Sequence, residues 1–147
     1  MTWDGAFHLV NLSCVCASGE THQFEVRTLL GPDPEGEVLY CYAKPLPPGQ
    51  QGDAEYFATF KRLGLDLFQL DGVTNGLPAR YQRCGITRAL LPHIATRYAT
   101  RIRSSRHRPL EGETRTPSAT RVWQRMVDEK SAHYDATEDR YYYRRPV

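Results

Sequence analysis

The stretch YQRCGITRALL, residues 81–91, lies where the sequence changes from a strand pattern to a helix pattern. A single glycine, Gly85, stands at the change, and apolar residues recur at helical spacing from Ile86 onward. The first turn of a helix leaves backbone N–H groups unpaired, and the helix dipole favours negative charge there. Glycine has no Cβ, so an anion can approach the backbone closely. The stretch therefore predicts a phosphate-binding turn, although glycine also occurs at such turns for steric convenience alone.

Upstream of this stretch the sequence favours strands. Runs of β-forming residues predict strands at 6–17, 22–30, 38–43 and 65–73. The first three, within residues 1–43, have short connections typical of an antiparallel meander, with a loop at 31–37. Residues 44–52 contain three prolines, which remove backbone donors, so we expect a surface linker there. Apolar residues at helical spacing predict a helix over residues 53–63.

Downstream of Gly85 the pattern alternates between helices and strands. We expect a helix from Ile86, a short strand at 101–105, and a second helix with Thr116 as its N-cap and Pro117 at its first position. Residues 131–145 predict a closing hairpin. Together these elements indicate a single α+β domain of 147 residues with a mixed sheet.

The composition excludes several classes of protein. Apolar residues make up 40% and charged residues 24% of the chain, which is typical of a folded soluble domain. No apolar run approaches the roughly 20 residues that cross a bilayer, and the start does not resemble a secretory signal. Four cysteines are too few and too scattered to predict a disulfide framework, so we expect thiols in a reducing cytoplasm.

The charge is divided unevenly along the chain. Residues 1–75 carry four Lys/Arg against ten Asp/Glu, whereas residues 76–147 carry fifteen against seven. A basic half favours an anionic partner, either nucleic acid or a phosphorylated small molecule. A plain solvated face of arginines would give the same count.

The residues around Gly85 resemble the acetyl-CoA loop of the GNAT superfamily of N-acetyltransferases. That loop has Gln or Arg, two residues, Gly, one residue, then Gly or Ala. The matching residues and their basic neighbour are Gln82, Arg83, Cys84, Gly85, Ile86, Thr87 and Arg88. The later stretch TPSATRVWQRMV, residues 116–127, is similar to the second conserved helix of that superfamily. The resemblance covers about residues 65–143.

The resemblance implies a function as well as a GNAT-like fold. In that superfamily the loop amides bind the pyrophosphate of CoA, and the thioester lies between two splayed parallel strands. The reaction transfers an acetyl group from acetyl-CoA to an amine, which here would be a small molecule or a protein. Two residues depart from the pattern: Thr87 replaces Gly or Ala, and Trp123 replaces a tyrosine that protonates the leaving thiolate in many members. The helices that usually follow the first strand are not predicted either.

Asp71 is the best-placed candidate for a general base. An amine must lose a proton as it attacks a thioester, and a carboxylate near the end of the strand at 65–73 is positioned for this. A backbone N–H of the same strand is suited to stabilise the oxyanion. The alternative for Asp71 is a turn residue preceding Gly72. Tyr134 and residues 141–143, all tyrosines, are candidate acids.

Two further functions remain open from the sequence. One is a catalytically inactive GNAT-like binding or inhibitor module, which the residues at Thr87 and Trp123 favour. The other is a nucleic-acid-binding protein that uses the basic C-terminal half. No metal site is predicted, because Cys14 and Cys16 have no second pair at zinc-ligand spacing.

Overall fold

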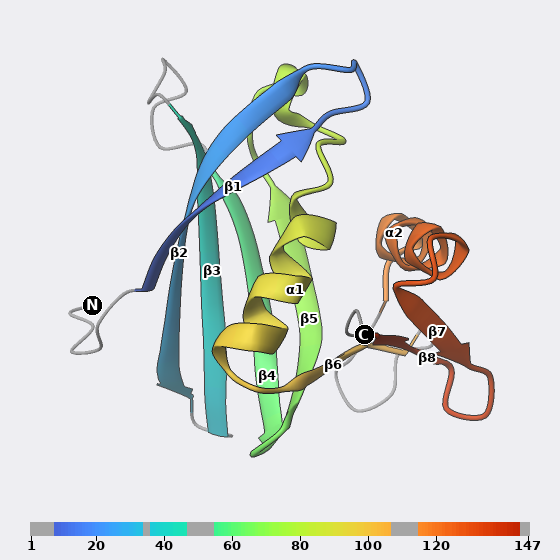
Figure 1. The fold of residues 1–147 in the computed structure, drawn as a ribbon. Helices are drawn as coiled ribbons and strands as arrows, with labels where there is room; N and C mark the ends of the chain where they lie inside the picture. The colour runs from blue at the N-terminus through green and yellow to red at the C-terminus, as the bar shows by residue number, and fades with distance from the viewer. Residues whose placement is uncertain (1–7, 34–35, 47–54, 107–114, 145–147) are drawn as a thin grey trace.

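The computed structural model describes residues 8–33, 36–46, 55–106 and 115–144. Within these ranges the chain forms one eight-stranded sheet and two α-helices (Figure 1). The strands are β1 (His8–Val15), β2 (Thr21–Asp33), β3 (Gly36–Leu46), β4 (Tyr56–Gly64), β5 (Leu67–Asn75), β6 (Arg101–Ser104), β7 (Ala132–Asp135) and β8 (Arg140–Tyr143). The helices are α1 (Ile86–Arg97) and α2 (Pro117–Asp128), and a 3₁₀ turn, η1 (Ala79–Tyr81), precedes α1.

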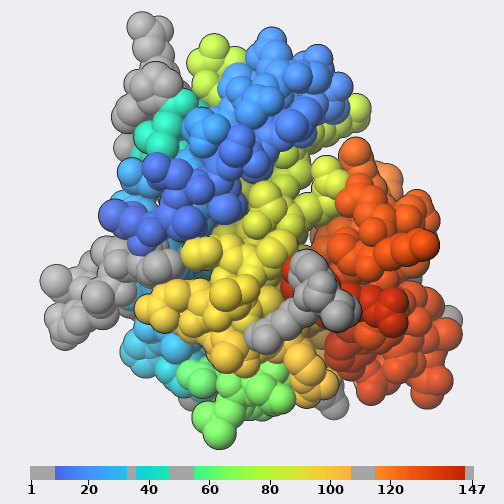
Figure 2. Space-filling view, in the orientation of Figure 1, coloured from blue at the N-terminus to red at the C-terminus, as the bar shows by residue number. Residues whose placement is uncertain are grey.

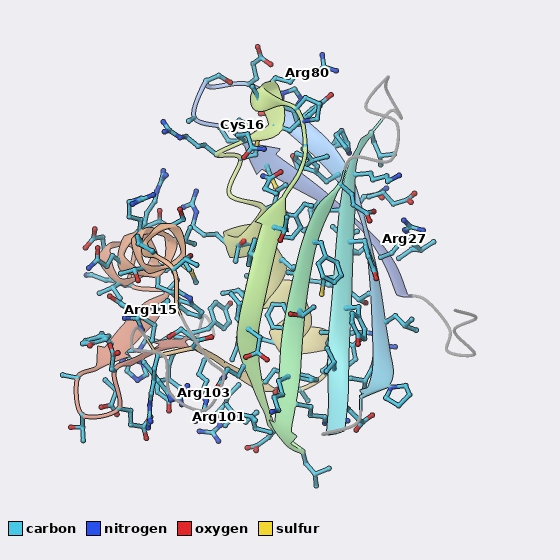
Figure 3. All side chains as sticks on the ribbon, turned by 180° about the vertical axis from the view of Figure 1, so that it is seen from behind. Cys16, Arg27, Arg80, Arg101, Arg103 and Arg115 are labelled. Atoms are coloured by element: carbon cyan, nitrogen blue, oxygen red, sulfur yellow. A yellow bond between two sulfur atoms is a disulfide. The ribbon has the colours of Figure 1, made fainter. Side chains whose placement is uncertain are left out.

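The sheet has the order β1-β2-β3-β4-β5-β6-β8-β7 and curls into a half-barrel. Neighbouring strands are antiparallel except β5 and β6, which are parallel and are joined by α1. Helix α1 lies in the concave face of the half-barrel, and Figure 3, seen from behind, shows no helix over the opposite face of β2 to β5. Helix α2 stands to one side, next to β7.

The structure confirms the predicted mixed-sheet α+β class and several of its elements. The meander, the strand at 65–73, both helices, the short strand at 101–104 and the closing hairpin are all present. The Thr116 side chain caps α2, since its Oγ1 accepts a hydrogen bond from the backbone N–H of Ala119 at 3.1 Å. Trp123 is buried and stacks on Tyr141, with ring centroids 6.0 Å apart.

The predicted helix over residues 53–63 is wrong, because residues 56–64 form strand β4. Tyr56, Ala58 and Phe60 alternate into the core, and the residues between them are less buried. An aromatic cluster at positions 56, 57 and 60 fits both a helical and a strand period. Pairing of β4 with β3 and β5 decides between them, and this pairing is non-local. Residues 53 and 54 lie outside the described ranges.

The predicted loop at 31–37 and linker at 44–52 are also partly wrong. Strand β2 continues through Pro32 to Asp33, and β3 continues through Pro45 to Leu46. Among the described residues each proline lies where its strand pairs on one side only, which tolerates a missing N–H: the pairing of β1 with β2 is described as far as Thr28, and that of β4 with β3 as far as Ala43. Residues 47–54 lie outside the described ranges.

The prediction of four free thiols is wrong for two of them. Cys16 and Cys84, 68 residues apart, form a disulfide, whereas Cys14 and Cys41 are buried free thiols. The turn between β1 and β2 folds onto the segment preceding α1, which brings the two cysteines together. The number and spacing of cysteines carry no information about such a tertiary contact.

Candidate functional site

The site begins where β5 loses its second neighbour. Residues 67–70 of β5 pair with β6, and the ladder stops at Leu70 and Ser104. At the same point β5 has a bulge, because Leu70 pairs with Phe60 and Gly72 pairs with Thr59, which leaves Asp71 without a partner on β4. Beyond the bulge β5 continues beside β4 alone among the described residues, and its other edge faces the start of α2 across a hollow.

The loop that follows β5 presents unpaired donors to this opening. Among the described residues, no hydrogen-bond acceptor lies within reach of the backbone N–H groups of residues 83–88. Gly85 is the N-cap residue of α1 and has a left-handed φ of 68°, and Arg83 has a φ of 55°. Donors at the start of a helix, together with the helix dipole, form a site suited to an anion.

A continuous cleft runs from this loop to Asp71. One hollow of about 780 Å³ is lined by residues 82–88 and by Tyr56, Arg121 and Arg125. A second hollow, of about 470 Å³, is lined by residues 70–75 of β5 and by Trp123. Six residues line both hollows: Val73, Asn75, Gln82, Thr87, Ser118 and Val122. In the space-filling view the yellow-green segment leading into α1 and the orange α2 lie on either side of this cleft (Figure 2).

Four arginines surround the wider hollow: Arg83, Arg88, Arg121 and Arg125. The Arg88 side chain folds back over the loop, since a Cβ on Gly85 would lie 2.9 Å from its Nη2. Its Nη1 also contacts Glu129 Oε1 at 2.6 Å, and Arg125 Nε lies 3.4 Å from the same oxygen. Glu129 therefore positions the guanidinium groups of Arg88 and Arg125 at the cleft.

Other arginines of the basic half are used inside the protein. Arg115 is buried, pairs with Asp139 at 3.1 Å and donates to the Ser105 carbonyl at 3.0 Å. Arg140 is buried and donates to the Ser104 carbonyl at 3.1 Å. The charge count of residues 76–147 thus overstates the basic surface available to a nucleic acid.

Thr87 is fixed by a tyrosine that the sequence analysis placed in a helix. The hydroxyls of Thr87 and Tyr56 are 2.7 Å apart, and Tyr56 is buried on β4. Burial raises the pKa of the Tyr56 hydroxyl, and the hydrogen bond to Thr87 only partly offsets this. Tyr56 therefore stays protonated at neutral pH and joins the start of α1 to the sheet.

Gln82 supports the loop. Its Nε2 donates to the Leu77 carbonyl at 2.7 Å and to the carbonyl and side-chain oxygens of Asn75 at 3.1 and 3.2 Å. The end of β5 and the loop are therefore bonded through one amide group. Gln82 also lines both hollows, so it sets the shape of the cleft where they meet.

Asp71 is exposed and lines the narrower hollow. Its Oδ1 accepts a hydrogen bond from Gln69 Nε2 at 3.0 Å. The Gln69 amide is oriented by two guanidinium groups, because its Oε1 accepts from Arg103 Nε at 2.9 Å and from Arg140 Nη1 at 2.8 Å. This leaves only the amide nitrogen of Gln69 to face Asp71.

The tyrosines predicted as candidate acids do not line either hollow. Tyr134 donates to Asp139 Oδ1 at 2.8 Å, and this contact raises its pKa. Tyr141 packs beside Trp123, and Tyr142 is hydrogen-bonded to Glu138. Tyr143 is buried in the core. Trp123 lines the cleft, and its indole N–H is not an acid at neutral pH.

The cleft thus combines predicted and unpredicted residues. The predicted loop, Gln82 to Arg88, and Asp71 lie along the same cleft. Tyr56, Asn75, Arg121 and Arg125 also line the cleft and were not predicted as site residues. A helical-wheel reading of residues 117–128 would have placed Arg121 and Arg125 on one face, but only the tertiary structure brings that face to the loop.

Comparison with family models, curated proteins and solved structures gives no match to the chain. Among the described residues, no helix is long and apolar enough to cross a membrane. Within the same residues, no three His, Cys, Asp or Glu side chains gather as metal ligands.

Proposed function

We propose that the protein transfers an acyl group from acetyl-CoA to an amine. The observation that carries the proposal is the row of unpaired N–H groups at residues 83–88, which faces an arginine-lined cleft at the start of α1. The pyrophosphate of CoA is an anion of the kind that such a helix start binds. The parallel pair β5 and β6, joined by α1 and paired only over residues 67–70 of β5, also agrees with a GNAT-like arrangement.

The proposed reaction takes place in the narrower hollow. The amine nitrogen attacks the thioester carbonyl, the C–N bond forms, the C–S bond breaks, and CoA leaves as a thiolate, which takes its proton from water. Asp71 accepts the proton of the amine, and the Gln69 amide holds the carboxylate in position. The bulge at Asp71 provides backbone groups of β5 at the cleft, where a donor would stabilise the oxyanion.

Binding of CoA without turnover is the second candidate function. Trp123 lines the cleft at the position where the resemblance leads us to expect a tyrosine acid. Neither hollow is lined by the other candidate acids, Tyr134 and the tyrosines at 141–143. A protein that retained the loop and lost the chemistry would bind acetyl-CoA and release no free thiol in the presence of amines.

The binding test is calorimetric titration of acetyl-CoA. We expect micromolar affinity, about −8 kcal/mol, for the wild type. Gly85→Glu places bulk and negative charge at the phosphate position and should weaken binding by at least about 100-fold. Arg88→Ala removes one guanidinium contact and should weaken it about two- to fivefold.

Gly64→Glu is the matched control, because a side chain at Gly64 meets open space at the β4–β5 turn. Circular dichroism checks that each variant is folded. If folded Gly85→Glu binds acetyl-CoA with the same affinity as Gly64→Glu, the loop does not bind the pyrophosphate, and the proposed acyltransferase function is rejected.

The chemical test follows release of free CoA with a thiol reagent over a panel of amines. Asp71→Asn should slow release, and the deficit should shrink as the pH rises toward the pKa of the amine, because the amine then needs no base. Equal rates in the wild type and Asp71→Asn would exclude Asp71 from the mechanism. Tight binding without release would favour the inactive module.

A further inference from the structure

The Cys16–Cys84 disulfide is attached directly to the proposed phosphate-binding loop. Cys84 immediately precedes Gly85 and lines the wider hollow, whereas Cys16 immediately follows β1, 68 residues earlier. Figure 3 shows Cys16 at the same end of the molecule as Arg80, which precedes the loop. We propose that this disulfide is a redox-controlled clamp that holds the loop in its anion-binding conformation and releases it on reduction.

The loop conformation needs a restraint. Arg83 and Gly85, on either side of Cys84, both have left-handed φ values, of 55° and 68°. A non-glycine residue adopts this region at a cost, and it persists there only where its surroundings impose it. The disulfide provides a covalent restraint on the residue between them.

Gln82 and Thr87 hold the two ends of the loop through hydrogen bonds, and the exposed Arg83 depends on contacts beside the disulfide. The Ala17 N–H donates to the Arg83 carbonyl at 3.1 Å, next to the disulfide. Cys84 and Ile86 are buried in the core, and the Tyr81 ring meets His22 and Phe24 edge to face, at 5.0 and 6.0 Å. Arg83 between them is exposed, so opening the disulfide leaves it joined to the β1–β2 turn by one backbone hydrogen bond among those of the described residues.

The consequence concerns pre-organisation of the N–H groups at residues 83–88. With the disulfide closed, these donors are fixed before a ligand arrives, so binding does not need to order them. With the disulfide open, Arg83 can return to a negative φ, and that rotation reorients the neighbouring peptide groups. The effect on acyl-CoA rests on the proposed function, but the effect on the loop does not.

The chemical step is thiol–disulfide exchange with a small dithiol. One thiolate of the dithiol attacks Sγ of Cys16 or Cys84, forms a mixed disulfide and displaces the other cysteine as a thiolate. The second thiol of the reagent then closes its own disulfide and releases the remaining cysteine. Two electrons pass to the protein, which gains two thiols, and the dithiol becomes a cyclic disulfide.

The remaining cysteines do not compete in this exchange. Cys14 lies two residues from Cys16 on β1, and burial raises its pKa, which disfavours the thiolate. Cys41 is buried on β3, and burial raises its pKa strongly. In a reducing compartment, such as the cytoplasm that the sequence predicts, the open form prevails, and in an oxidising compartment the closed form prevails.

The loop is tested by limited trypsin digestion, because Arg80 and Arg83 are exposed. The samples are oxidised wild type, wild type reduced with dithiothreitol, Cys16→Ala, and the control Cys14→Ala, which removes a buried thiol from the same strand. Mass spectrometry should show cleavage after Arg83 about tenfold faster in the reduced protein and in Cys16→Ala. Oxidised wild type and Cys14→Ala should stay slow.

Calorimetric titration of acetyl-CoA on the same four samples tests the link to the site. Affinity should fall about three- to tenfold on reduction and in Cys16→Ala, and recover when the wild type is reoxidised. Faster cleavage with no acetyl-CoA binding in any sample would support the clamp and reject the proposed function. Equal cleavage with equal binding in all samples would reject the clamp and leave the proposed function intact.

Circular dichroism distinguishes a local clamp from a structural crosslink. The reduced protein and Cys16→Ala should keep the wild-type spectrum while cleavage after Arg83 accelerates. Loss of the folded spectrum in both would overturn the proposal, since the disulfide would then stabilise the whole fold. Failure of dithiothreitol to reduce the native protein would overturn it as well.

Discussion

The two ends of β5 have different surroundings within one strand. Residues 67–70 lie between β4 and β6, and Phe68 and Leu70 are buried. Residues 71–75 follow the bulge, pair with β4 only among the described residues, and border the cleft. The first end builds the core, and the second end lines the candidate site. One strand can therefore belong to the core and to a cleft in succession when one of its neighbours ends partway along it.

The largest effect should come from truncating the buried end. Phe68 is 2% exposed, so Phe68→Ala should cost about 3–5 kcal/mol of unfolding free energy through lost burial and a cavity. Val73, at the open end, is 41% exposed, and Val73→Ala should cost less than about 1 kcal/mol. Urea unfolding measures both. Similar costs would mean that the open end is as well packed as the paired end.

An intermediate effect should come from replacing a glutamine by glutamate near each end of β5. Gln82→Glu removes an amide that donates to two oxygens of Asn75 and to the Leu77 carbonyl. It should therefore lower the free energy of unfolding by about 1–3 kcal/mol. Gln69→Glu places a carboxylate between Arg103 and Arg140, and this attraction offsets its repulsion from Asp71. Its net cost should stay within about 1 kcal/mol. Equal costs in urea unfolding would contradict the hydrogen-bond network described at one of the two ends.

The smallest effect concerns pH and the Tyr56–Asn75 pair at the open end. Burial raises the pKa of Tyr56 in the folded protein, whereas an unfolded tyrosine ionises near about pH 10. The folded state therefore keeps a proton that the unfolded state loses, and stability should fall as the pH rises above about 10. Tyr56→Phe should flatten that fall and cost about 1 kcal/mol at neutral pH through the lost bond to Thr87.

Urea unfolding at pH 7, 9 and 11 measures this dependence. Cys41 has a raised pKa as well, so a fall that begins near about pH 8.5 should remain in Tyr56→Phe. A variant with the wild-type pH dependence would show that Tyr56 is not the group responsible.

Local patterns predicted the elements that depend on nearby residues. The cap at Thr116, the helix from Ile86 and the closing hairpin each follow from signals within a few residues, and all are present. Strand β4 was missed because Tyr56 and Phe60 suit either period, and only pairing with a distant segment selects the strand. The same limit applies to the tertiary contact between Cys16 and Cys84.

For the candidate site, the sequence predicted the glycine loop and Asp71 but not their surroundings. A helix start after a glycine is visible in seven residues, and the structure lines a cleft with them. Tyr56, Arg121 and Arg125 reach the cleft from β4 and α2, which meet the loop only after the sheet has formed. Residues recruited from separate elements cannot be inferred from spacing alone.

The prolines in β2 and β3 bear on how this protein meets other chains. At each end of the β2–β3 hairpin one strand extends past the described part of its outer neighbour and carries Pro32 or Pro45 on that stretch. A proline has no N–H to offer an incoming strand, so each of these stretches provides one donor fewer for sheet extension. Pro32 and Pro45 therefore make the two ends of the hairpin weaker templates for a strand of another chain than an uninterrupted edge would be.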